Sequence, residues 1–295
     1  MKKLLFVLFC LVFGTAVSAQ AHSVWINNFV SEAHQPPHSI VSIGWGHAMP
    51  MDDIPNSPNG RILLESFQVI DPDLNRTDLR TPAADESKPS QVTANFDVFP
   101  GDLAVQKVAL KKESKPGVYQ FSAVSVPTFY TQYLDKGGRQ RIALKPRDQV
   151  KDIDKLLMSV KFQAFAKSYM TVGGQWTQPK PLGHGLEITP VTDLSNLRVG
   201  DLVQVEVLFN GEPLSVTAKS VDYITAYSAG FGQSDHFSLQ SYIMQGKAQF
   251  RVQCAGQWMV SVNHKEDVTS DGPMKELSGK ADQVYHGASL TFTVK

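Results

Sequence analysis

The chain has 295 residues, and its 28 basic and 28 acidic side chains give a formal net charge of zero. A balanced charge provides no positive field for a polyanion, which argues against nucleic acid as a partner. The only cysteines are Cys10 and Cys254. Since Cys10 falls in the leader described next, an intramolecular disulfide is not expected and an apolar core must hold the fold together.

The first residues predict a signal peptide. Two basic residues precede an unbroken apolar run over residues 4–13, and small residues follow it. This order is typical of a secretory leader, and the run is shorter than the ~20 residues that span a bilayer. We therefore expect residues 1–21 to be a leader, cut after Ala19 or after Ala21, and the mature chain to work in the periplasm. No other stretch is long and apolar enough to span a membrane.

Most of the remaining chain alternates apolar and polar residues between Gly, Pro, Asn and Asp turn signals, which is typical of β-strands. Helical spacing occurs only over residues 148–159, where Val150, Ile153, Leu156 and Leu157 fall on one side, and it predicts one short helix. The alternation predicts strands over residues 39–43, 63–70, 103–110, 118–126, 162–172, 202–208, 214–223, 248–254, 257–263 and 290–294.

A proline-rich stretch, Gln178-Pro179-Lys180-Pro181, predicts a domain boundary because a strand interior does not accommodate it. We expect an N-terminal β-sandwich domain with loop insertions over 22–181 and a second domain over 182–295. The second has about seven expected strands, which is the size of an immunoglobulin-like sandwich. The predicted fold class is therefore all-β, with two β-sandwich domains, the C-terminal one immunoglobulin-like, and one short helix.

Histidines carry the chemistry that the sequence suggests. Motifs of the common enzyme classes are absent from the sequence, and we do not expect an enzyme. A cut after Ala19 would make His22 the third residue, so that the amine, two amide nitrogens and the imidazole could wrap a square-planar Cu(II) or Ni(II). A cut after Ala21 would make His22 the first residue, and its amine and ring would form a two-point clamp completed by other side chains.

A second cluster follows an expected strand, in the sequence Gly44-Trp45-Gly46-His47-Ala48-Met49-Pro50-Met51-Asp52-Asp53. Loops at the ends of a sheet often carry binding residues, so His47 and Asp52 are candidate metal ligands. His264 ends another expected strand on the same face as Trp258. It could point into a site at the end of the sandwich, or it could serve only as a polar cap on the core.

The ordered set of motifs resembles a bacterial periplasmic family described as a nickel/cobalt transport-associated domain, once grouped with the membrane subunit of nickel uptake systems. That resemblance implies capture or delivery of Ni(II) or Co(II) beside an uptake transporter. It matches His22 and His47, and less closely His264, to polar positions of the family, although Ser23 replaces a common acidic residue. The motifs that carry it are Ala21-His22-Ser23-Val24-Trp25, Gly46-His47-Ala48-Met49-Pro50, Gly117-Val118-Tyr119-Gln120-Phe121, Gly183-His184-Gly185-Leu186-Glu187-Ile188-Thr189-Pro190, Val207-Leu208-Phe209-Asn210-Gly211-Glu212-Pro213-Leu214, Gly256-Gln257-Trp258-Met259-Val260 and Leu290-Thr291-Phe292-Thr293-Val294.

Three functions follow from these observations. The leading one is a periplasmic metal-binding accessory protein for nickel or cobalt uptake, which passes the ion to a membrane transporter component. The second is a copper histidine-brace protein or enzyme, which requires a leader cut directly before His22. The third is a non-metal module that recognises a peptide or sugar through Phe129, Tyr130 and Tyr133. The choice among metals stays open, because copper exceeds nickel in intrinsic affinity for such sites.

Overall fold

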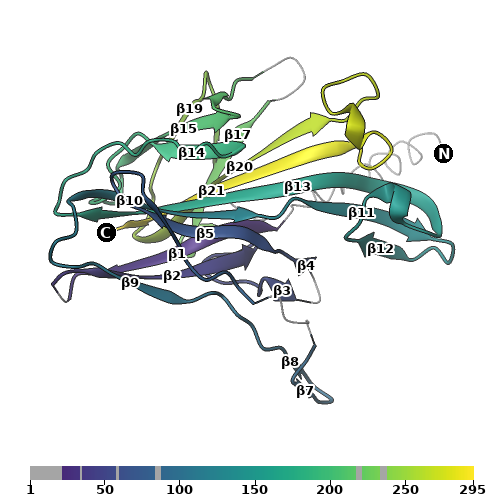
Figure 1. The fold of residues 1–295 in the computed structure, drawn as a ribbon, viewed down its shortest axis with the longest axis horizontal. Coiled ribbons are helices and arrows are strands. Elements are labelled where there is room, and N and C mark those ends of the chain that lie inside the picture. The colour runs from purple at the N-terminus through teal and green to yellow at the C-terminus, as the bar shows by residue number, and fades with distance from the viewer. Residues whose placement is uncertain (1–21, 34, 58–59, 84–87, 217–220, 233–237) are drawn as a thin grey trace, which may run out of the picture.

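The computed structural model describes residues 22–33, 35–57, 60–83, 88–216, 221–232 and 238–295. The expected leader, residues 1–21, lies outside them. Across the described residues every regular element is a strand apart from two short 3-10 turns, so the protein is all-β, as predicted (Figure 1). The same part of the chain contains no helix long and apolar enough to cross a membrane.

One large sheet forms the middle layer of the molecule. Its strands are β5 (Leu64–Ile70), β6 (Arg76–Asp78), β10 (Gly117–Ser125), β11 (Thr128–Asp135), β12 (Gln140–Ala143), β13 (Ile153–Val172), β17 (Tyr223–Ser228), β18 (Leu239–Tyr242), β20 (Gly256–Asp267) and β21 (Gln283–Val294). The order is β18-β17-β20-β21-β13-β10-β5-β6, and β11 and β12 extend it beside β13. The pair of β13 and β21 is parallel and joins the two halves of the chain into one sheet.

A three-stranded antiparallel sheet covers one face of this layer (Figure 1). It consists of β1 (Ser23–Ser31), β2 (His38–Gly46) and β9 (Gln106–Ala109). Apolar residues of β1, β2, β5, β10 and β13 form the N-terminal core beneath it. The contact with β21 is polar, because Ser289 Oγ donates to the Val24 carbonyl at 2.6 Å and Thr291 Oγ1 donates to the Ile26 carbonyl at 2.5 Å.

A smaller sheet covers the opposite face in the C-terminal half (Figure 1). It consists of β14 (Leu186–Pro190), β15 (Leu202–Phe209), β16 (Glu212–Pro213) and β19 (Lys247–Arg251). Between this sheet and β17, β20 and β21 lies the C-terminal core, to which Leu290 and Phe292 belong. Alternate residues of β21 thus face two different layers, which makes it a shared central strand.

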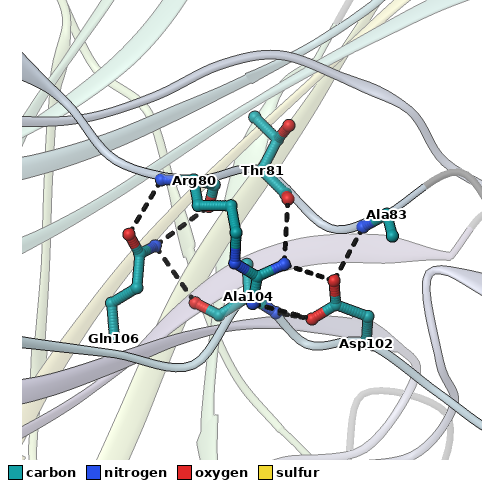
Figure 2. Close-up of polar contacts among 6 residues, drawn as sticks. All are labelled: Arg80, Thr81, Ala83, Asp102, Ala104 and Gln106. Atoms are coloured by element: carbon teal, nitrogen blue, oxygen red, sulfur yellow. Dashed lines mark hydrogen bonds and ion pairs between the residues drawn. The ribbon is translucent and has the colours of Figure 1, made fainter.

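A polar cluster fastens the segment that leads to the short hairpin of β7 (Gln91–Val92) and β8 (Asp97–Val98) (Figure 2). Both terminal nitrogens of Arg80 contact the carboxylate of Asp102. The amide of Gln106 accepts from the Arg80 N–H at 2.8 Å and donates to the Arg80 carbonyl at 2.9 Å. The Arg80 guanidinium holds the pKa of the Asp102 carboxyl well below its usual range. The hairpin of β3 (Asn56–Ser57) and β4 (Gly60–Arg61) lies on the same side of the molecule (Figure 1).

The helix expected over residues 148–159 does not form. A 3-10 turn, η1 (Arg147–Gln149), precedes β13, and a second turn, η2 (Lys275–Leu277), precedes β21. The pairing of β13 with β11 skips Leu157 and Asp154, so each is an extra residue in a bulge. Each bulge interrupts the period of two, and the apolar residues acquire the spacing of a helix.

Of the strand expected over residues 214–223, residues 217–220 lie outside the described part of the chain; residues 214–216 and 221–222 form no strand, and β17 begins at Tyr223. Leu214 is buried in the C-terminal core, whereas Val216 and Val221 are 41% and 57% exposed. The alternating apolar residues therefore share no buried face. The boundary expected near residue 181 falls in the connection between β13 and β14.

Candidate functional site

Two histidines far apart in the sequence lie together at one end of the N-terminal sheet. His22 directly precedes β1, His47 directly follows β2, and the antiparallel register sets Ser23 opposite Gly46. The centroids of the two imidazole rings are 4.4 Å apart, with 30° between their planes. The His22 ring also stacks on Trp45, with the centroids 4.9 Å apart.

The loop after β2 holds His47 through backbone contacts. Gly46 has a φ of +126°, and a Cβ there would lie 2.4 Å from Asp52 Oδ2, so this position requires glycine. The same Oδ2 accepts a hydrogen bond from the His47 backbone N–H at 2.7 Å. The Asp53 N–H donates to the Trp45 carbonyl at 3.0 Å. The Asp52 carboxylate therefore holds the loop by a hydrogen bond to the backbone of His47.

The spacing of the two rings fits a shared metal ion. Imidazole nitrogens lie about 2.0 Å from a bound transition metal. Two imidazoles that bind one ion with a nitrogen–metal–nitrogen angle of about 90° therefore have ring centroids about 4.5 Å apart. Ordinary ring packing gives a similar spacing, so the geometry permits an ion without requiring it. A cavity of about 10 Å³ beside His22, with Ser261, Asn263 and Ser289 in its wall, has room for about one water molecule.

His264 does not join this pair. Ser261 and Asn263 of β20 line the cavity beside His22, so His264, one residue further along the strand, points to the opposite face of the sheet. There its Nδ1 lies 3.0 Å from Asp222 Oδ2, and its ring packs on Phe209. The structure thus brings two of the four predicted ligands, His22 and His47, together. Asp52 accepts a hydrogen bond from the backbone of the loop, and His264 lies in the C-terminal sandwich.

His264 has a second histidine as its neighbour. In the register of β20 and β21 it faces His286, whose Nε2 lies 3.8 Å from Glu266 Oε2. Burial, followed by repulsion from His264 and Lys161, lowers the pKa of His286 to about 4. His286 is therefore neutral in the folded protein at neutral pH.

A buried ion pair that the sequence analysis missed lies between the two cores. Lys167 Nζ is 2.6 Å from Glu187 Oε1, and the two side chains are 2% and 1% exposed. The carboxylate also accepts the backbone N–H groups of Leu182, Gly183 and His184. Burial lowers the pKa of the neighbouring His184 to about 4. A lysine inside an apolar strand was the signal for this pair, because a buried lysine requires a partner.

No group of three or more His, Cys, Asp or Glu side chains within the described residues could hold a metal ion. Among these four residue types the described part of the chain therefore offers the two imidazoles of His22 and His47 and no third ligand beside them. Backbone nitrogens, water or groups of another molecule can supply further ligands for an ion at this pair.

The fold and the ring pair define an all-β sandwich protein with one imidazole at the start of its first strand and a second at the end of the neighbouring strand. The family model for the domain of unknown function DUF4198 matches residues 19–266, and the chain belongs to this family. The matched range includes His22, His47 and His264. No curated protein matches the sequence. The crystal structure of a DUF3823 family protein from Bacteroides uniformis is similar over 93% of this chain and 100% of that chain, with 11% identity and a TM-score of 0.22, which is too low to support an inference.

Proposed function

We propose that the protein is a periplasmic accessory protein that binds Ni(II) or Co(II) through His22 and His47 and passes the ion to a membrane transporter. The observation that supports this proposal is the 4.4 Å spacing of the two imidazole rings. Both ions accept nitrogen-rich sites, and imidazole is a suitable ligand for them. The periplasmic location follows from the leader expected over residues 1–21.

The processed N-terminus completes the site in this proposal. With a cut after Ala21, the His22 amine joins the two rings to give three nitrogen ligands. With a cut after Ala19, the terminal amine, two backbone amide nitrogens and the His22 ring fill the four positions of a square plane instead. The first arrangement leaves a position for water, and a carrier that must release its ion needs such an exchangeable position. Acid weakens binding, because an imidazole must be neutral to bind a metal.

Metal titration of the exported and processed protein, with any tag at the C-terminus, tests the proposal. Intact mass gives the N-terminus, and calorimetry with Ni(II), Co(II), Cu(II) and Zn(II) gives affinity and stoichiometry. We expect one Ni(II) or Co(II) per chain, with affinity at least ten-fold lower in His22→Ala and in His47→Ala. His38→Ala is the matched control, since His38 begins β2 at the end away from His47. Equal binding by all four proteins would overturn the proposal.

A copper histidine brace is the second candidate, because the same ring pair supplies the two histidines that it needs. It requires an N-terminus at His22 and a preference for Cu(II) over Ni(II) and Co(II). An intact mass that places Gln20 first would exclude it.

The alternative of a non-metal module at Phe129, Tyr130 and Tyr133 has less support. The Tyr130 ring packs edge-on against Phe162, and its hydroxyl donates to the Arg61 carbonyl at 3.0 Å. Burial raises the pKa of Tyr130 to about 12. Tyr130 therefore packs into the N-terminal core and does not offer its ring to a ligand.

A further inference from the structure

A groove of about 530 Å³ lies on the C-terminal sandwich, away from the two histidines. Its floor consists of residues of β15 and β19, including outward-facing side chains, and β18 supplies one wall. The volume is within the range of about 300–1,000 Å³ that is usual for small-molecule sites. Nothing in the proposed metal function uses this groove.

The floor of the groove is polar and electrically balanced. Gln204 of β15 donates to Gln249 of β19, with Nε2 and Oε1 3.0 Å apart. Each amide can both donate and accept hydrogen bonds, so this pair suits hydroxyl groups. Glu206 and Lys247 are cross-strand partners in the same pair of strands, so their opposite charges are adjacent. An ionic ligand therefore meets no excess of either charge.

One aromatic residue belongs to the wall of the groove. Tyr242 lines the groove and is 64% exposed, and its cross-strand partner Tyr223 is 45% exposed. Met244, also in the wall, is 65% exposed. Cross-strand partners lie side by side on one face of a sheet, so the two tyrosines form a continuous exposed platform. A patch of large exposed side chains next to a groove is typical of a binding surface.

We propose that this groove binds a neutral glycan. A sugar ring presents an apolar face that suits the Tyr242 ring and a rim of hydroxyls that suits the amides of Gln204 and Gln249. The balanced charge of the floor disfavours anions, and its amides disfavour a purely apolar ligand. Among the described strands, β18 pairs only with β17 and β19 only with β15, so capture of an extended peptide along a strand edge is the competing outcome that the test must distinguish.

The test screens the processed full chain against an array of neutral and charged glycans and an array of peptides. The oligosaccharide that binds most strongly is then titrated by calorimetry. We expect binding to neutral glycans, and a loss of affinity of roughly five- to ten-fold in Tyr242→Ala, the effect of one stacked ring. Gln249→Ala should weaken binding as well. Both residues are exposed, so the melting temperature of each variant should stay close to that of the unaltered protein.

Phe96→Ala is the matched control, because Phe96 is an aromatic residue with 60% exposure on the β7–β8 hairpin. It should bind the glycan as the unaltered chain does. His22→Ala should also keep glycan binding, which separates this proposal from the metal proposal. No binding to any neutral glycan, binding to peptides alone, or unchanged affinity in Tyr242→Ala would overturn the inference.

Discussion

Lys167 of β13 and Glu187 of β14 form an ion pair, 2.6 Å from Nζ to Oε1, that is almost completely shielded from water. Lys167 Nζ also lies 3.4 Å from Thr189 Oγ1 and above the Tyr169 ring. The pair lies where the chain passes from the N-terminal half to the C-terminal half, so it connects β13 to the first strand of the smaller sheet. Breaking such a pair leaves one charge buried without a partner.

Lys167→Met should therefore lower the free energy of unfolding by about 3–5 kcal/mol, because Glu187 would keep a buried charge. The double variant Lys167→Met with Glu187→Leu should recover part of this loss, although the backbone N–H groups of Leu182 and Gly183 then lose their acceptor. Urea unfolding measures both effects. A change in the free energy of unfolding below about 1 kcal/mol for Lys167→Met would show that the fold does not depend on this ion pair.

Acid should destabilise the fold between pH 6.5 and pH 4. The pKa values of His184 and His286 are lowered to about 4 in the folded protein, from an ordinary value near 6.5. In this range the unfolded chain binds more protons than the folded protein. The free energy of unfolding is therefore highest above pH 6.5 and falls as the pH decreases toward 4. Each histidine contributes up to about 3 kcal/mol of this loss by pH 4. The free energy of unfolding, measured from pH 7 to pH 4, should vary less in His184→Gln and in His286→Gln. If the free energy of unfolding depends on pH in both variants as it does in the unaltered protein, these two histidines are not the cause of the acid sensitivity.

Gly46→Ala should weaken metal binding more than it weakens the fold. A Cβ at residue 46 would lie 2.4 Å from Asp52 Oδ2 and would displace the carboxylate that holds the His47 backbone. Gly174→Ala is the matched control, because Gly174 also has a positive φ but has no atom within 4 Å of the added Cβ. Calorimetry with Ni(II) and thermal unfolding of both variants compare the two effects. Equal metal affinity in both variants would mean that the loop does not position His47.

The role of Asp52 can be separated by two substitutions. If its carboxylate only accepts the His47 N–H, Asp52→Asn keeps an oxygen acceptor and should retain most of the metal affinity, whereas Asp52→Ala should lose several-fold. If Asp52 is a metal ligand, Asn should lose nearly as much affinity as Ala, since the amide oxygen is a weaker ligand. We expect the first pattern in the Ni(II) titration.

Much of the fold was predictable because alternation and turn residues report which strand faces are buried. The failure at residues 148–159 has a local cause, since the bulges at Asp154 and Leu157 give a strand the spacing of a helix. Which strands pair with each other could not be predicted in the same way. The parallel pairing of β13 and β21, which unites the two halves, joins residues more than a hundred positions apart and leaves no local pattern in the sequence.

The candidate site was predictable only in part for a similar reason. His22 and His47 were proposed together, and the antiparallel register of β1 and β2 places them side by side. Alternation correctly gave His264 the face of Trp258, but the sequence does not reveal that the N-terminal sheet covers the other face of β20. Lys167 and Glu187 were missed because their pairing depends on how β14 packs over β13.

X-ray absorption at the nickel edge of the Ni(II)-loaded, processed protein tests most directly whether His22 and His47 bind one ion. We expect the scattering of two imidazoles with nitrogens at about 2.0–2.1 Å, reduced to one imidazole in His47→Ala. His38→Ala should give the spectrum of the unaltered protein. A nickel site without imidazole scattering, or one that His22→Ala and His47→Ala both leave unchanged, would contradict the two-histidine site.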